Sequence, residues 1–220
     1  MSASSPSSGL HIRRAHKADI PTLVKISSEA FRGRPLTEAL FPPHLSKGLD
    51  QEEKLAFRRA WHENGFDNEN RHYIVVVDGP DDSNIVGSAC WQSRDDPLES
   101  QLMPEQLRAQ CPPTMDLAAL DIIERDTKVL KKNLLDALGE EAYKNSWYLA
   151  AISVDPAQQR RGIGRMLMDW GEERAAKEHK NIRLMASAAG AKLYRALGYE
   201  EVGAVECLGG MEYAFIKKAA

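Results

Sequence analysis

Residues 154–170, with the sequence VDPAQQRRGIGRMLMDW, constrain the fold of this chain more than any other stretch. Pro156 prevents a preceding strand from continuing. The apolar residues that follow recur at the spacing of one helical face, namely Ile163, Met166, Leu167 and Trp170. Gly162 and Gly164 therefore lie at a helix N-terminus, and the segment predicts a strand, a tight turn and a helix in that order.

The turn between this strand and helix predicts an anion-binding site. Unpaired N–H groups at a helix N-terminus point outward together, and the absence of a Cβ at Gly162 and Gly164 lets phosphate oxygens approach. The helix dipole favours negative charge there, and Arg160, Arg161 and Arg165 add charge-assisted hydrogen bonds. The turn thus predicts binding of a diphosphate or a similar polyanion. It matches neither a P-loop nor a dinucleotide fingerprint, and the alternative that its glycines serve only a tight connection stays open.

The remaining patterns predict strands and helices in alternation. Before the turn, we expect strands at 11–14, 72–78 and 84–92 and helices at 17–31, within 32–43, and at 51–64. Next come helices at 104–110 and 116–138 and a strand at 147–155. After the turn, we expect a helix at 162–180, a strand at 182–186, a helix at 189–197, and a hairpin of 201–208 with 211–217. Residues 93–146 therefore predict a purely helical stretch between the third and fourth strands.

Composition excludes several classes of protein. With 43% hydrophobic and 28% charged residues in a chain of 220, global disorder is excluded. The net charge of -3 provides no overall positive field for nucleic acid or an anionic membrane, and no apolar run approaches the roughly 20 residues of a membrane span. The three cysteines, Cys90, Cys111 and Cys207, lack metal-type spacing and predict a reducing, cytoplasmic location. Residues 1–9 are Ser-rich and are expected to form a flexible tail.

The string Gln159-Arg160-Arg161-Gly162-Ile163-Gly164 after a Val-Asp-Pro strand end resembles the acyl-CoA signature of the GCN5-related N-acetyltransferase (GNAT) superfamily. The resemblance is strongest over 147–202, and the order of elements agrees from residue 11 to residue 217. It implies a GNAT-like α/β fold, a mixed, mostly antiparallel twisted sheet flanked by helices. Residues 10–220 would then form a single domain, with 93–146 as a helical insertion between the third and fourth strands.

The resemblance also implies acetyl-CoA as cosubstrate. The amides of the 160–165 turn would hold its pyrophosphate, and the strand residues before the turn would pair with the pantetheine arm as an added strand. An N–H near Ile152 would stabilise the oxyanion that forms during transfer. The cofactor-binding residues implied in this way are Ile152, Ser153, Val154, Gln159, Arg160, Arg161, Gly162, Ile163, Gly164, Arg165 and Ser187.

A second motif at 187–199 is similar to the family's Asn-x-x-Ala-x-x-x-Tyr helix followed by Leu-Gly-Phe/Tyr. Ser187 replaces the usual Asn and Gly190 the usual Ala. The resemblance implies that Tyr194 is the catalytic acid that protonates the departing thiolate. Leu193 and Leu197 suit the core, whereas Tyr194 projects about 100° around the helix from Leu193. A tyrosine that only packs, with no proton transfer, is the alternative.

The general base is not evident from the motifs. The strand at 147–154 offers no carboxylate where many relatives of the family carry a Glu. The resemblance suggests Glu29, Glu38 and Glu212, because the family's acceptor cleft is built from the first helices and the last strands. The six histidines show no metal spacing, so no metal is predicted.

We therefore expect an N-acetyltransferase, an acyltransferase that moves the acetyl group of acetyl-CoA to a primary amine by direct attack in a ternary complex. The net charge of -3 and a helical insertion able to cap the cleft favour a small-molecule acceptor. Two alternatives stay open, a protein lysine or N-terminal acetyltransferase and a non-catalytic CoA-binding regulatory module. The sequence predicts no nucleic-acid or membrane partner and leaves the oligomeric state undetermined.

Overall fold

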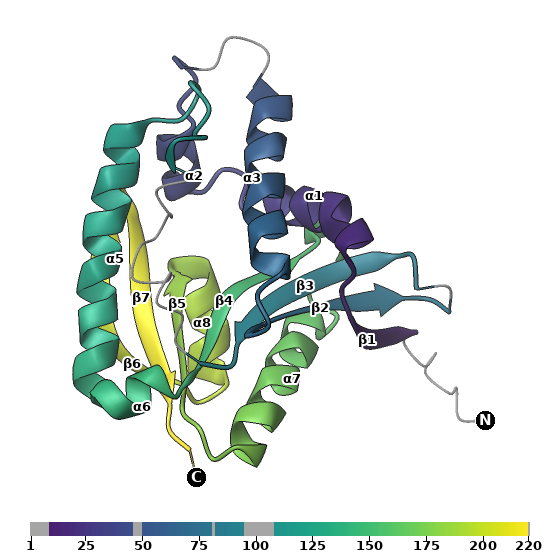
Figure 1. The fold of residues 1–220 in the computed structure, drawn as a ribbon, viewed down its shortest axis with the longest axis vertical. Helices are drawn as coiled ribbons and strands as arrows, with labels where there is room; N and C mark the ends of the chain where they lie inside the picture. The colour runs from purple at the N-terminus through teal and green to yellow at the C-terminus, as the bar shows by residue number, and fades with distance from the viewer. Residues whose placement is uncertain (1–8, 46–49, 81, 95–107, 220) are drawn as a thin grey trace.

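The protein is built on a seven-stranded sheet with the strand order β1-β2-β3-β4-β5-β7-β6 (Figure 1). The computed structural model describes residues 9–45, 50–80, 82–94 and 108–219. The strands are β1 Leu10–Arg14, β2 Arg71–Asp78, β3 Ile85–Gln92, β4 Trp147–Val154, β5 Ile182–Ser187, β6 Glu200–Cys207 and β7 Gly210–Lys217. Among the described strands, β4 and β5 are the one parallel pair. The predicted mixed, mostly antiparallel sheet is confirmed.

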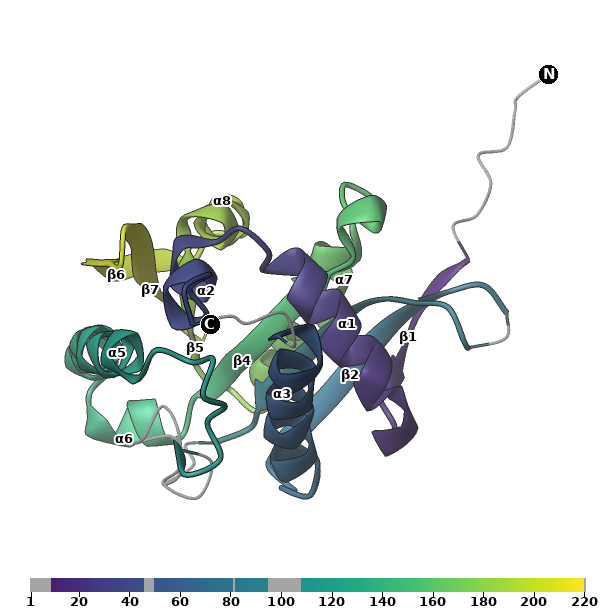
Figure 2. The ribbon, with the colours of Figure 1, turned by 90° about the horizontal axis from the view of Figure 1, so that it is seen from above.

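Helices cover both faces of this sheet, as Figure 2 shows for α7 and α8 on one side and α3, α5 and α6 on the other. Alternate residues of β2 bury their side chains on opposite faces. Ile74 and Val76 join a core with Leu167 of α7, whereas Val75 and Val77 pack with Leu23 of α1. The α-helices are α1 Ile20–Ala30, α2 Pro35–Leu40, α3 Asp50–Phe66, α5 Leu117–Leu138, α6 Glu140–Lys144, α7 Ile163–Lys177 and α8 Ala188–Ala196, with 3-10 turns η1 Lys17–Asp19 and η3 Pro156–Gln158.

The helical insertion between β3 and β4 is confirmed as α5 and α6. Asp116 starts α5 by accepting the N–H groups of Ala118 and Ala119 at 2.9 and 3.1 Å. The buried face of α5 includes Leu120 and Ile123, and its Leu130 and Leu134 pack on β7. The predicted tail at 1–9 and the helix at 104–110 lie almost entirely outside the described residues. None of the helices in the described ranges combines the length and apolar composition that a membrane span requires.

Candidate functional site

A gap opens in the sheet between β4 and β5. The two parallel strands pair only where residues 147–149 lie beside 182–184, and 150–154 have no β5 partner in the described sheet. On its other side, β4 pairs with β3 through a register shift in which Cys90 opposes Ala151 and Trp91 opposes Leu149. Ala150 is therefore the extra residue of a β-bulge, which bends a strand away from its neighbour. The edge of β4 beyond the bulge can accept an extended ligand as an added strand.

The predicted strand residues Ile152, Ser153 and Val154 lie along this edge. The hydroxyl oxygen of Ser153 is 3.1 Å from that of Ser88 on β3, so its side chain is engaged within the sheet. Ile152 and Val154 are half-buried and pack against the core. What these residues can offer the gap is their main chain, which agrees with the mode of contact implied by the sequence.

The turn between β4 and α7 presents the uncapped N-terminus predicted from the sequence. Asp155 shapes the start of the turn, since its carboxylate accepts the N–H of Ala157 at 2.9 Å. Arg160 and Gly162 both have left-handed backbones, with φ of 67° and 81°, and Gly162 is the N-cap of α7. No side chain of the described residues caps this helix. The N–H groups of its first turn therefore have no acceptor within the described chain.

Space is left around these N–H groups. A Cβ at Gly162 would meet no atom within 4 Å, and a Cβ at Gly164 would meet only the Leu193 side chain, at 3.6 Å. An open cradle of unpaired amides at a helix N-terminus fits the diphosphate of a CoA molecule.

The three arginines of the turn have different surroundings. Arg161 Nη1 donates to the carboxylate of Asp78 at 2.7 Å, a bond that raises the pKa of Arg161 and ties the turn to β2. Arg165 pairs with Asp169 one helical turn along at 2.6 Å. The exposed side chains of Gln159 and Arg160 make no hydrogen bond to any described residue. Arg160 is therefore the cation of the turn that stays available to an anionic ligand.

Ser187 connects β5 to α8. As the N-cap of α8, it accepts the N–H of Gly190 at 3.4 Å. Its observed role is to start the helix that carries Tyr194. A contact from its hydroxyl to a bound ligand, implied by the resemblance, stays a prediction.

Tyr194 is buried in the core, with 3% of its surface exposed, whereas Leu193 and Leu197 are half-buried. The expectation that the two leucines suit the core is confirmed, since both pack against the core cluster, but Tyr194 is itself a member of that cluster. The face of α8 toward the sheet is Ala191 and Tyr194, and the Tyr194 ring centroid lies 5.7 Å from that of Phe215. Burial raises the pKa of Tyr194, so its phenol stays protonated at neutral pH.

Among the three candidate bases, Glu212 has the most distinctive surroundings. It lies on β7 opposite Ser187, at the end of β5 where the gap is open. Its carboxylate is 3.3 Å from the guanidinium of Arg34. Burial raises the pKa of Glu212, although Arg34 acts in the opposite direction. Glu29 pairs with Arg32, and Glu38 is exposed.

Asp78, Asp155 and Arg34 were not identified from the sequence. Asp78 and Arg34 are far in sequence from the groups they contact, so no local pattern points to them. Asp155 lies directly before Pro156 at the end of a strand. This pattern is typical of a capped turn, so the sequence did contain a signal for the role of Asp155.

Comparison with known proteins agrees with this geometry. A family model described as the acetyltransferase (GNAT) domain matches residues 122–201. A search of curated proteins gives no match.

Solved structures show the same fold. A structure from Corynebacterium glutamicum, described as histone acetyltransferase HPA2 and related acetyltransferase, is 20% identical, with a TM-score of 0.63 over 96% of this chain and 97% of that one. Agmatine N-acetyltransferase is 16% identical, with a TM-score of 0.62 over 96% and 99%. The Salmonella typhimurium protein YncA, solved with acetyl-CoA, is 15% identical, with a TM-score of 0.51 over 96% and 94%.

The matched domain ends within β6 and contains the gap, the turn at 160–165 and α8. Acetyl-CoA is the cosubstrate of this type of domain, and the open cradle of this chain fits it. Residues 122–201 therefore match the acetyltransferase (GNAT) domain, and the whole chain shares its fold with solved acetyltransferase structures.

Proposed function

We propose that this chain transfers an acetyl group from acetyl-CoA to the primary amine of a small molecule by direct attack in a ternary complex. The observation that carries the proposal is the continuity of the site. The unpaired edge of β4 leads from the bulge at Ala150 to the uncapped N-terminus of α7. An extended arm that ends in a diphosphate fits this path. Acetyl-CoA supplies the activated acetyl group as a thioester.

In this proposal, the residues of the turn and strand hold the cosubstrate. Amides of the 160–165 turn bind the diphosphate, helped by the available guanidinium of Arg160. The main chain of Ile152, Ser153 and Val154 pairs with the arm. An N–H near Ile152 stabilises negative charge on the carbonyl oxygen while the amine attacks.

Acid and base act from opposite faces of the sheet. Tyr194 packs against Phe215, whereas Ala214, which points to the other face of β7, packs under α5. Glu212 shares the face of Ala214 because residues two apart on a strand point the same way. We infer that Glu212 removes the proton of the amine on one side of the gap. Tyr194, whose phenol is neutral, protonates the thiolate on the other side.

The class of acceptor rests on a separate observation. The described helices α1, α2 and α3 enclose a cavity of about 440 Å³ on the face of Glu212, a volume typical of small-molecule sites. The fold alone does not distinguish a small-molecule acceptor from a protein acceptor. The similar structures include agmatine N-acetyltransferase and a structure described as histone acetyltransferase HPA2 and related acetyltransferase. We also propose a cytoplasmic location, because no disulfide joins the three cysteines.

The absence of a carboxylate on β4 favours one rival, a CoA-binding module without transfer activity. Thiol release from acetyl-CoA over a panel of amines, amino acids and peptides separates the two functions. We expect release with small amines, together with a rise in melting temperature on adding acetyl-CoA. Gly164→Glu, which puts a carboxylate in the cradle, should abolish both effects.

The outcomes of this experiment are distinct. Thermal stabilisation without thiol release on any acceptor would establish the binding module. Release only with peptides would establish a protein acetyltransferase. Equal behaviour of Gly164→Glu and the unchanged protein would remove the turn from the cosubstrate site.

A further inference from the structure

The cavity between α1, α2 and α3 has an unusual charge for this protein. Five basic side chains line it, Lys25, Arg32, Lys54, Arg58 and Arg59, against two carboxylates, Glu29 and Glu38. The whole chain has a net charge of -3, so the positive character is local.

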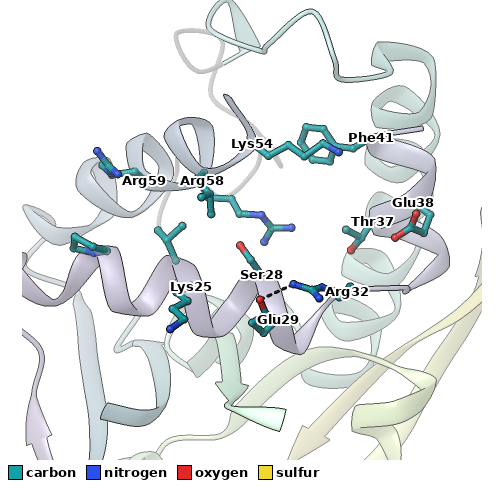
Figure 3. A pocket seen from close by; sticks show the side chains of 13 residues that line it. Lys25, Ser28, Glu29, Arg32, Thr37, Glu38, Phe41, Lys54, Arg58 and Arg59 are labelled. Carbon is teal, nitrogen blue, oxygen red and sulfur yellow. Dashed lines mark hydrogen bonds and ion pairs between the residues drawn. The ribbon is translucent and has the colours of Figure 1, made fainter. Parts of the chain in front are cut away.

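The two carboxylates of the cavity wall already have partners. Glu29 pairs with Arg32 at 2.5 Å, as the dashed line in Figure 3 shows. Glu38 accepts the N–H of Gly33 at 3.3 Å. Neither carboxylate contacts Arg58, so the central guanidinium of the cavity lacks a counter-charge from this wall.

Arg58 reaches from α3 into the space between α1 and α2, with Ser28 and Thr37 on the facing walls (Figure 3). It makes no ion pair or hydrogen bond with any described residue. Burial lowers the pKa of Arg58, and no acid among the described residues offsets that effect. Holding a half-buried guanidinium without an anionic partner is unfavourable, and an anion bound in the cavity would relieve this cost.

A second unpartnered group faces the same space. The Ser28 hydroxyl oxygen is buried on the cavity wall and has no hydrogen-bond partner in the described chain. Buried hydroxyl groups usually have a partner, so this group also points to a missing ligand. A hydroxyl donor beside a guanidinium matches the oxygens of a carboxylate or a phosphate.

We propose that this cavity binds the carboxylate or phosphate group of a small organic anion, held by Arg58 and Ser28. Two sources of this group fit the chemistry, the acid group of the acceptor itself and a separate anionic effector. The acceptor source rests on the proposed function. It is supported by the loop between α1 and α2, since Arg32 lines the cavity while Arg34, two residues on, contacts Glu212. An amine with an acid group would place its two ends on either side of this loop.

Binding is tested by calorimetric titration with inorganic phosphate and with glutarate, on the unchanged protein, Arg58→Gln and Ser28→Ala. Lys128→Gln is the matched control, because it removes an equal charge from an exposed position on α5. We expect Arg58→Gln to weaken binding at least tenfold, Ser28→Ala to weaken it less, and Lys128→Gln to leave it unchanged. Phosphate also suits the turn at 160–165, so the titration is repeated in Gly164→Glu, which should retain the binding that depends on Arg58.

Acetyl transfer to γ-aminobutyrate and to butylamine distinguishes the sources, since these amines differ by one carboxylate. If the acid group belongs to the acceptor, kcat/KM favours γ-aminobutyrate at least tenfold, and Arg58→Gln removes that preference. Anion binding without such a preference identifies an effector. If neither anion binds the unchanged protein, or if Arg58→Gln binds as tightly as Lys128→Gln, the proposal is wrong. Loss of acetyl transfer on every amine, with anion binding intact, would overturn the proposed function and leave the anion site standing.

Discussion

Gly171 on α7 is a position where a single added methyl group should disturb the core between α7 and the sheet. A Cβ at this residue would fall well inside contact distance of three ring atoms of Trp91 on β3. The ring has little freedom to move, since Trp91 is fully buried and its Nε1 donates to the main-chain oxygen of Leu167 at 3.1 Å. Gly171→Ala therefore forces α7 and β3 apart.

The expected size of this effect follows from two opposing contributions. Overpacking a core costs about 1–3 kcal/mol, and the higher helix propensity of Ala returns up to about 1 kcal/mol. A net loss of about 1–2 kcal/mol lowers the melting temperature of a chain of this size by about 2–8 °C. Thermal denaturation followed by circular dichroism measures this shift.

The matched control for Gly171→Ala is Gly164→Ala on the same helix. A Cβ at Gly164 makes only an ordinary contact with Leu193, at 3.6 Å, so the melting temperature should stay the same or rise slightly. If both variants melt at the same temperature, the reasoning from Trp91 fails.

Three further predictions concern titrating and catalytic groups. Tyr194→Phe should lower turnover about 100-fold with little change in acetyl-CoA affinity. The control Tyr199→Phe, which removes a comparably buried hydroxyl, should leave turnover unchanged. If Tyr194→Phe turns over as fast as the unchanged protein in steady-state assays, Tyr194 is not the acid. Because burial raises the pKa of Glu212, the acid limb of the pH–kcat/KM profile should lie above pH 4.5, and Glu212→Gln should remove that limb; a limb retained in the variant would assign the base elsewhere. Burial and Arg58 lower the pKa of His62 to about 4, below its ordinary 6.5. As the pH drops, the imidazole is therefore protonated at a higher pH in the unfolded chain than in the folded one, and the free energy of unfolding should fall between pH 6.5 and pH 4. In denaturant titrations, His62→Gln should show a weaker fall over that range, and an unchanged slope would contradict the assignment.

Local patterns were sufficient where an element is defined by its own residues. The turn at 160–165 was predicted in place because proline, paired glycines and a helical stripe all lie within one segment. The end of α7 was not predicted correctly, since the helix was expected to reach residue 180 but ends at Lys177. Two residues later, His179 adopts a left-handed backbone with φ of 53°. A glycine usually marks such a stop, and this sequence has none there.

Long-range contacts explain what the patterns missed. The five-residue helix α6 is too short to show a period, and Tyr143 within it stacks on the guanidinium of Arg183 at 4.2 Å. That guanidinium is fully buried on β5 and also lies over the ring of Tyr148. No pattern in residues 140–144 signals a partner about forty positions away. Arg58 could not be identified from the sequence for the same reason, because nothing in the residues around it distinguishes it from an ordinary solvent-exposed charge on a helix.

The acceptor side of the site is positioned by residues outside both motifs. At one end, the insertion contacts α2, since the N–H of Asp116 donates to the main-chain oxygen of Leu40 at 2.9 Å and Leu120 packs with Phe41. Farther along the same helix, Leu130 and Leu134 pack on β7, the strand of Glu212. One continuous helix, α5, therefore sets the separation between the cavity wall on α2 and the carboxylate beside the gap. In the proposed site, the cosubstrate contacts the turn and the edge of β4, which the motifs describe. The proposed acceptor depends on a distance fixed by the insertion, and this is why the motifs point to the donor without identifying an amine.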